Sequence, residues 1–295
     1  MGRALFAAVV AAFAGATAAQ AARAEEGAAI YTVGIGDRKL VELVEDPTGE
    51  GAPIAPSWSH DGRTIVFARL PCDGCAAEIR RVPIGDRGEG LGVVIANGLT
   101  PSLSATGTVV FVGFDRALYA VPLRHGRPRR VLAPSGGAPT IDQPNVSRDG
   151  RRVVFVRHDV RGRGWIETVR IDGRGRRRLT RTGAYANPAW SPDSRRVAFA
   201  RQDAGGKWRI CVMKADGTAL RVIGRPGASD SYPTWSPDGR QIAFVRERRF
   251  GHSLYAASSI DGSGLRRLTP PTLDAIQPAW SPDGRRVAFV VNGGD

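Results

Sequence analysis

Residues 278–290 read PAWSPDGRRVAFV, and two close copies read PTWSPDGRQIAFV at 233–245 and PAWSPDSRRVAFA at 188–200. Looser copies begin at Pro56, Pro101 and Pro144. The six starting prolines are therefore 45, 43, 44, 45 and 45 residues apart. A fixed period of this length is typical of repeat architectures.

Each repeat contains the strands of a small antiparallel sheet. The Ser-Pro-Asp-Gly centre has the composition of a tight turn, and runs rich in Trp, Val, Ile and Phe flank it. A second half follows, as in residues 253–269, where SLYAA and LRRLT enclose the turn IDGSG. Four short strands per period predict one propeller blade, and Gly and Pro interrupt any helical pattern.

The two ends of the chain supply complementary halves of one blade. The sequence holds six first halves, but the last one ends with the chain at Asp295. Residues 30–43 (IYTVGIGDRKLVEL) read as strand, turn and strand. We therefore predict an all-β, six-bladed propeller over residues 25–295, closed by pairing the N-terminal half-blade with the C-terminal one, because closure removes exposed sheet edges.

Residues 1–24 have the composition of a secretory signal peptide. Arg3 precedes the small apolar residues 4–19, and Ala22-Arg23-Ala24 offers a cleavage site before Glu25. The apolar run is short for a membrane span, so we predict an exported protein, periplasmic or secreted, without stable membrane insertion. An uncleaved N-terminal anchor is the alternative.

Three cysteines and an excess of arginine characterise the remainder of the chain. Cys72 and Cys75 could close a small disulfide loop in an exported protein or remain free thiols, and Cys211 is predicted to lie in the core. The net charge of +14 comes from 42 Lys and Arg residues, of which only three are Lys. Arginine runs such as 174–178 and 127–130 form either a basic rim for anionic polymers or a solvated sheet edge. Stacking aromatics are not interleaved with these runs, so no nucleic-acid partner is expected.

At the repeats with Trp190, Trp235 and Trp280, and to a lesser degree Trp58, the chain resembles the TolB-type propeller repeat. The resemblance covers essentially the whole chain after the signal segment and is weakest after Pro101. It implies the propeller fold and, more loosely, binding to an envelope protein, as in the Tol–Pal system. From this sequence we expect neither the separate α/β domain that precedes the propeller in TolB nor the hydrolase domain of propeller peptidases.

The sequence shows no catalytic motif, and we predict no catalytic residue, metal site or cofactor. It lacks a Gly-x-Ser-x-Gly elbow, a His-Glu-x-x-His pair and a phosphate-binding loop. A cluster assembled from separate blades is the alternative. The recurring aspartates occupy the same turn of successive repeats, so they are predicted to form turns. They are Asp61, Asp149, Asp193, Asp238 and Asp283.

The residue before each repeat proline varies within a constant frame. These six residues are predicted to ring one mouth of the central channel, close to Asp142, Asp230 and Asp274, and to contact a partner. They are Ala55, Thr100, Gln143, Asn187, Tyr232 and Gln277. Ordinary loop variation is the alternative explanation.

Two functions follow from these features. The first is a monomeric, non-enzymatic envelope protein that presents its channel mouth to a protein partner. The alternative is a protein that binds or acts on an acidic polysaccharide through its basic surface or channel.

Overall fold

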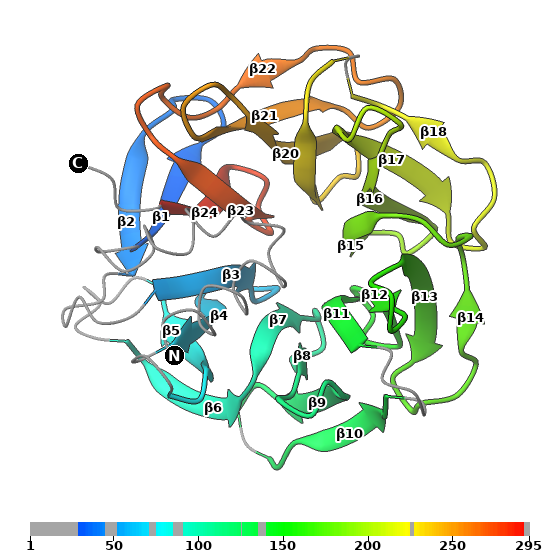
Figure 1. Cartoon of the computed structure of the whole chain (residues 1–295). Helices are drawn as coiled ribbons and strands as arrows, with labels where there is room; N and C mark the ends of the chain where they lie inside the picture. The colour runs from blue at the N-terminus through cyan, green and yellow to red at the C-terminus, as the bar shows by residue number, and fades with distance from the viewer. Residues whose placement is uncertain are drawn as a thin grey trace.

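The computed structural model describes residues 29–44, 52–70, 75–84, 91–124, 126–134, 140–224 and 227–291. Twenty-four strands form six four-stranded sheets, which stand around a central axis as the blades of a propeller (Figure 1). The predicted fold class is therefore confirmed. The described residues contain no helix that is long and apolar enough to cross a membrane.

Each blade runs from an innermost strand at the axis to an outermost strand at the rim. Blade 1 holds β3 (Ala52–Trp58), β4 (Thr64–Leu70), β5 (Glu78–Pro83) and β6 (Val93–Asn97). Blade 2 holds β7 (Leu99–Leu103), β8 (Thr108–Val112), β9 (Leu118–Pro122) and β10 (Arg129–Leu132). Blade 3 holds β11 (Thr140–Val146), β12 (Arg152–His158), β13 (Gly164–Arg170) and β14 (Arg177–Arg178).

The other three blades repeat this order. Blade 4 holds β15 (Tyr185–Trp190), β16 (Arg196–Gln202), β17 (Trp208–Lys214) and β18 (Arg221–Val222). Blade 5 holds β19 (Asp230–Trp235), β20 (Gln241–Glu247), β21 (His252–Ser258) and β22 (Arg266–Arg267). Blade 6 joins β23 (Ala275–Trp280) and β24 (Arg286–Val291) to β1 (Ala29–Gly34) and β2 (Leu40–Val44).

Blade 6 closes the ring with both ends of the chain. β1 pairs antiparallel with β24 from Ala29 opposite Val291 to Gly34 opposite Arg286. The sheet order is β2-β1-β24-β23, which is the pairing predicted from the two half-blades. This closure gives β24 a hydrogen-bonded neighbour on each side, so the edges of blade 6 are its innermost strand β23 and its outermost strand β2, as in the other blades.

The core lies between neighbouring blades, where the second strand of each sheet is covered on both faces. Val153, Val154, Phe155 and Val156 of β12 are all fully buried, as the uninterrupted apolar runs predict. Arginine and tryptophan add a polar clamp between blades. The Arg152 guanidinium lies 4.6 Å from the Trp190 ring centroid of the next blade and donates to the Ser194 carbonyl.

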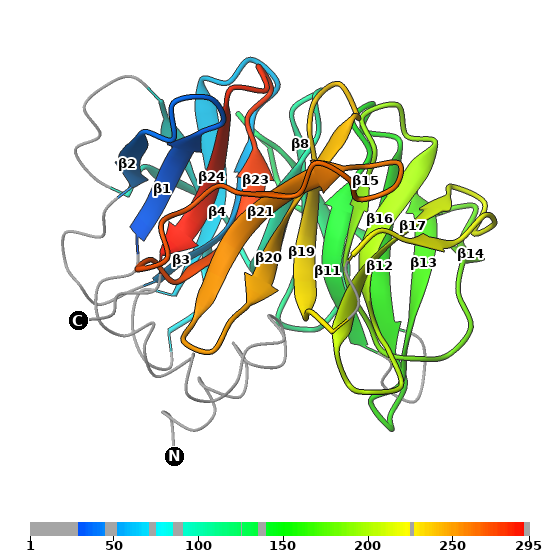
Figure 2. The same cartoon turned by 90° about the horizontal axis from the view of Figure 1, so that it is seen from above.

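The antiparallel order gives the ring two distinct ends (Figure 2). We call the end with the Ser-Pro-Asp-Gly turns, which join the first and second strands of the blades, the turn face. We call the opposite end, with the connections between the second and third strands, the hairpin face; its described hairpins are residues 113–117, 159–163, 203–207 and 248–251.

The turn aspartates act within their own turns, as predicted. In blade 6, Asp283 Oδ1 accepts from the Ser281 hydroxyl at 2.6 Å and from the Arg285 backbone N–H at 3.0 Å. Asp61, Asp149, Asp193 and Asp238 make the same pair of bonds. These bonds favour the ionised carboxylates and hold the pKa of each turn aspartate below its ordinary value, against the opposing effect of burial.

Candidate partner-binding site

The innermost strands of all six blades line one cavity of about 320 Å³ on the propeller axis. All six residues that precede the repeat prolines line this cavity, together with the prolines that follow them. We call these six residues the pre-proline belt. The structure brings these six residues together around the axis, and their predicted role in contacting a partner stays a prediction. The lining extends from the belt along each strand to the turn face, where His60 and Arg148 are exposed.

A bulge at the same point of every innermost strand places the belt. Pairing with the second strand skips the belt residue and its proline in each blade, as between Asp142 and Asn145 in blade 3 or Ser231 and Thr234 in blade 5. Proline has no N–H for the ladder, which explains why pairing fails there. All six belt residues have φ between 50° and 52°, in the left-handed region that residues other than glycine rarely adopt. This conformation recurs six times and is therefore part of the architecture.

Side chains of the belt satisfy backbone groups that the bulges release. Gln277 Oε1 accepts from the Ala55 N–H at 2.7 Å, and Gln143 Oε1 accepts from the Asn187 N–H at 2.7 Å. Asn187 Oδ1 accepts from the Tyr232 N–H at 3.3 Å. Each bond joins a belt residue to the belt residue of the next blade. Thus the amides that line the cavity also connect its walls.

Tyr232 is the largest side chain of the belt and remains neutral. Burial raises the pKa of its hydroxyl well above the ordinary value, and hydrogen bonds with the side chains of Gln277 and Asn187 only partly offset this rise. The other members are amides, one threonine and one alanine. The buried hydroxyl Oγ1 of Thr100 has no hydrogen-bond partner among the described residues. The belt therefore presents amide and hydroxyl groups without a formal charge.

The three nearby aspartates do not line the cavity. Asp142 lies 2.9 Å from His158 Nδ1, and Asp274 lies 2.8 Å from His252 Nδ1. Asp230 is fully buried and accepts two bonds from Arg246, at 2.7 and 2.9 Å. The structure thus brings the six belt residues together at the cavity. Each of the three aspartates instead pairs with a histidine or arginine of the surrounding sheets.

Two residues of the cavity entrance were missed by the sequence analysis. His60 and Arg148 line the cavity at the turn face, and Arg148 NH2 lies 3.1 Å from His60 Nδ1. Both stand where Pro192, Pro237 and Pro282 occur in the regular repeats. The sequence does contain a signal for these two residues. The regular repeats have Ser-Pro at this point, whereas the repeats of blades 1 and 3 have Ser59-His60 and Ser147-Arg148, which place a polar side chain where the others have a proline ring.

The remaining sequence predictions concern the signal peptide, the cysteines and a metal site. Residues 1–24 and Cys72 lie outside the described residues, so the signal peptide and the Cys72–Cys75 disulfide stay predictions. Cys211 is a buried free thiol, as expected for a core position. Within the described ranges, no group of three or more His, Cys, Asp or Glu residues is placed to hold a metal ion.

Comparisons with known proteins agree with this architecture. The model of the TolB β-propeller domain matches residues 126–295, and that of the lipoprotein LpqB β-propeller domain matches residues 35–187. No curated protein sequence matches the chain.

Solved structures include similar propellers at low sequence identity, so they show the fold alone. A putative TolB from Agrobacterium tumefaciens superposes with a TM-score of 0.71 at 20% identity, over 91% of this chain and 99% of that one. TolB from Acinetobacter baumannii superposes with a TM-score of 0.69 at 17% sequence identity, over 89% of this chain and 69% of that chain. An oligogalacturonate lyase in complex with manganese superposes with a TM-score of 0.58 at 13% sequence identity, over 92% of this chain and 98% of that chain. Since the matched TolB domain model spans more than half of the sequence, the chain belongs to the TolB β-propeller family.

Proposed function

We propose that this chain is an exported, non-enzymatic binding scaffold of the cell envelope, acting as a monomer. Its axial cavity receives a segment of a protein partner through the turn face. Membership of the TolB β-propeller family supports the envelope role, and the predicted signal peptide supports export. The observation that carries the proposal is the convergence of six belt residues on one cavity.

The chemistry of the cavity suits a polypeptide segment. The lining includes the repeat prolines and Trp58, Trp190, Trp235 and Trp280 as apolar residues, while the belt supplies uncharged hydrogen-bonding groups. Binding pockets combine these features, with a few polar groups that fix orientation. Arg148 is a charged residue of the cavity lining, and it lies exposed at the entrance of the cavity. We therefore expect the partner to insert an uncharged tip and to place a carboxylate near Arg148.

The entrance offers a clean test, because belt residues also hold the walls together. Arg148→Glu reverses the charge at the entrance, whereas Arg151→Glu reverses an exposed charge three residues away that does not line the cavity. Residues 25–295 would be immobilised and exposed to a detergent-solubilised envelope extract at moderate salt. We expect a protein that the parent and Arg151→Glu retain and Arg148→Glu loses. Equal retention by all three would overturn the cavity assignment.

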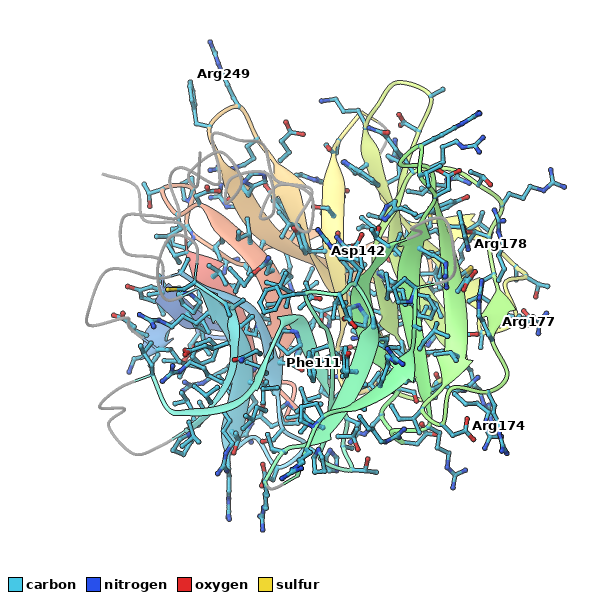
Figure 3. The ribbon with its side chains drawn as sticks, turned by 60° about the horizontal axis from the view of Figure 1, so that its bottom comes forward. Phe111, Asp142, Arg174, Arg177, Arg178 and Arg249 are labelled. Atoms are coloured by element: carbon cyan, nitrogen blue, oxygen red, sulfur yellow. The ribbon has the colours of Figure 1, made fainter. Side chains whose placement is uncertain are left out.

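The second candidate function is binding of, or action on, an acidic polysaccharide, and the arginine-rich rim favours it. Arg174, Arg177 and Arg178 point outward from the rim of blade 3 (Figure 3), and all three are exposed. Part of this charge has an intramolecular role, because Arg178 stacks 4.5 Å from the Trp165 ring centroid and Arg177 donates to the Asp216 carbonyl.

Oligogalacturonate is a suitable acidic probe for this alternative. Saturable binding or turnover that persists at moderate salt would favour the polysaccharide function, since nonspecific attraction between exposed charges is screened. Binding that disappears with salt would count against it.

A further inference from the structure

The hairpin face carries large apolar side chains at its tips. Phe250 is 80% exposed, Val160 is 74% exposed and Phe114 is 53% exposed. They occupy hairpins of blades 5, 3 and 2, respectively. Single exposed apolar residues are ordinary on protein surfaces, but these three recur at equivalent loops. Both phenylalanines that are strongly exposed among the described residues lie here.

Topology places these tips at one end of the molecule. Each lies between the second and third strands of its blade, and all second strands run toward the hairpin face. The side view shows the β12–β13 and β20–β21 hairpins at the same edge of the ring (Figure 2). Because the tips belong to different blades around that ring, one flat surface can meet them together.

Exposed cations flank two of the three tips. The Arg249 guanidinium lies 5.3 Å from the Phe250 ring centroid, and Figure 3 shows Arg249 projecting from its hairpin. Arg161 is exposed directly after Val160. Neither arginine belongs to an ion pair recorded among the described residues. The tips of blades 3 and 5 therefore each offer an apolar group beside an exposed cation that can meet an anion.

Most of the acidic side chains at these hairpin tips form hydrogen bonds or ion pairs within their own hairpin. Asp159 pairs with Arg163 at 2.8 Å and accepts from the Arg161 and Arg163 N–H groups. Asp115 accepts from the Tyr119 hydroxyl at 2.9 Å and from the Ala117 N–H. Glu247 at the end of β20 is exposed, but two arginines follow it. The outward charge beside Phe250 and Val160 is thus positive.

We propose that the hairpin face docks on the surface of an anionic phospholipid bilayer. Phe250, Val160 and Phe114 enter the boundary between headgroups and acyl chains, and Arg249 and Arg161 meet lipid phosphates. Peripheral proteins combine shallow apolar insertion with electrostatic attraction in this way, because neither contribution alone gives firm binding. This surface lies opposite the cavity entrance, so a docked propeller presents its turn face away from the membrane.

The docking proposal does not depend on a protein partner and can fail or succeed separately from the proposed function.

Vesicle co-sedimentation of residues 25–295, which contain all twenty-four strands, tests the proposal. We expect binding to vesicles of phosphatidylglycerol and phosphatidylcholine but not to phosphatidylcholine alone. Phe250→Ser should lower the partition coefficient roughly tenfold, because a buried aromatic side chain is lost from the bilayer. Arg249→Gln and Arg161→Gln should each lower it about fivefold.

Matched controls on the turn face separate docking from general charge or stickiness. Ile260 is 67% exposed and Arg240 is exposed, and both lie in turns of blade 5 on the turn face. Ile260→Ser and Arg240→Gln should leave the partition coefficient unchanged. The proposal is overturned if the parent ignores anionic vesicles or if the turn-face variants lose as much binding as the hairpin-face variants. Full binding by Phe250→Ser would refute the insertion of Phe250.

Discussion

Replacing Gln277 by leucine removes the amide that joins blades 6 and 1 in the pre-proline belt. Gln277 is 8% exposed, its Oε1 accepts from the Ala55 N–H at 2.7 Å, and its side chain also bonds the Tyr232 hydroxyl. Leaving a buried N–H unpaired costs about 1–3 kcal/mol, so the half-buried Ala55 N–H should cost about 1–2 kcal/mol, and the second bond contributes about 1 kcal/mol. The new apolar surface offsets part of this loss. We expect the free energy of unfolding to fall by about 2 kcal/mol.

Thr100→Val is the matched control at another belt position. The Thr100 hydroxyl is buried without a partner among the described residues, so a methyl group of similar size removes no bond. We expect a change within about 0.5 kcal/mol or a small gain in stability. Urea denaturation followed by circular dichroism would measure both variants. Equal stability of Gln277→Leu and Thr100→Val would refute the structural role assigned to the belt amides.

Three further predictions concern the surrounding scaffold. Glu167→Ala should cost about 3–5 kcal/mol in urea denaturation, because the carboxylate lies 3.7 Å from Arg157, whose side chain is fully buried; a loss below about 1 kcal/mol would contradict this reasoning. Ser194 has a φ of 56° where Gly239 has 69°, so Ser194→Gly should raise the melting temperature and Gly239→Ser should lower it; shifts of the same sign would be inconsistent with backbone strain. Because burial raises the pKa of Tyr232, the unfolded chain loses that proton first, and the folded state should lose stability above about pH 10. Tyr232→Phe should weaken this alkaline loss, and an unchanged pH profile would show that another group causes it.

The fold was predictable because its information is local and repeated. The turn Ser281-Pro282-Asp283-Gly284 and the apolar run after it specify two strands, and six repetitions specify the ring. Even the closure was accessible, because the unpaired half-blade at residues 30–43 complements β23 and β24.

The site was only partly predictable. Counting from the repeat prolines found the belt, since equivalent positions of the blades must meet at the axis. It did not reveal the left-handed φ or the hydrogen bond from Ala55 to Gln277, which depend on the bulge and on the adjacent blade. Sequence proximity also placed Asp230 near the belt, whereas its bidentate bond to Arg246 holds it in the sheet.

Site-specific photo-crosslinking in the envelope tests the central proposal most directly. A photoreactive residue would replace His60 at the cavity entrance and, as a control, Ile260 on the outer part of the same face. The account predicts that one protein is crosslinked through position 60, that position 260 does not give this product, and that Arg148→Glu abolishes it. The same products from both positions, or a product at position 60 that survives Arg148→Glu, would contradict the assignment of the axial cavity as the partner-binding site.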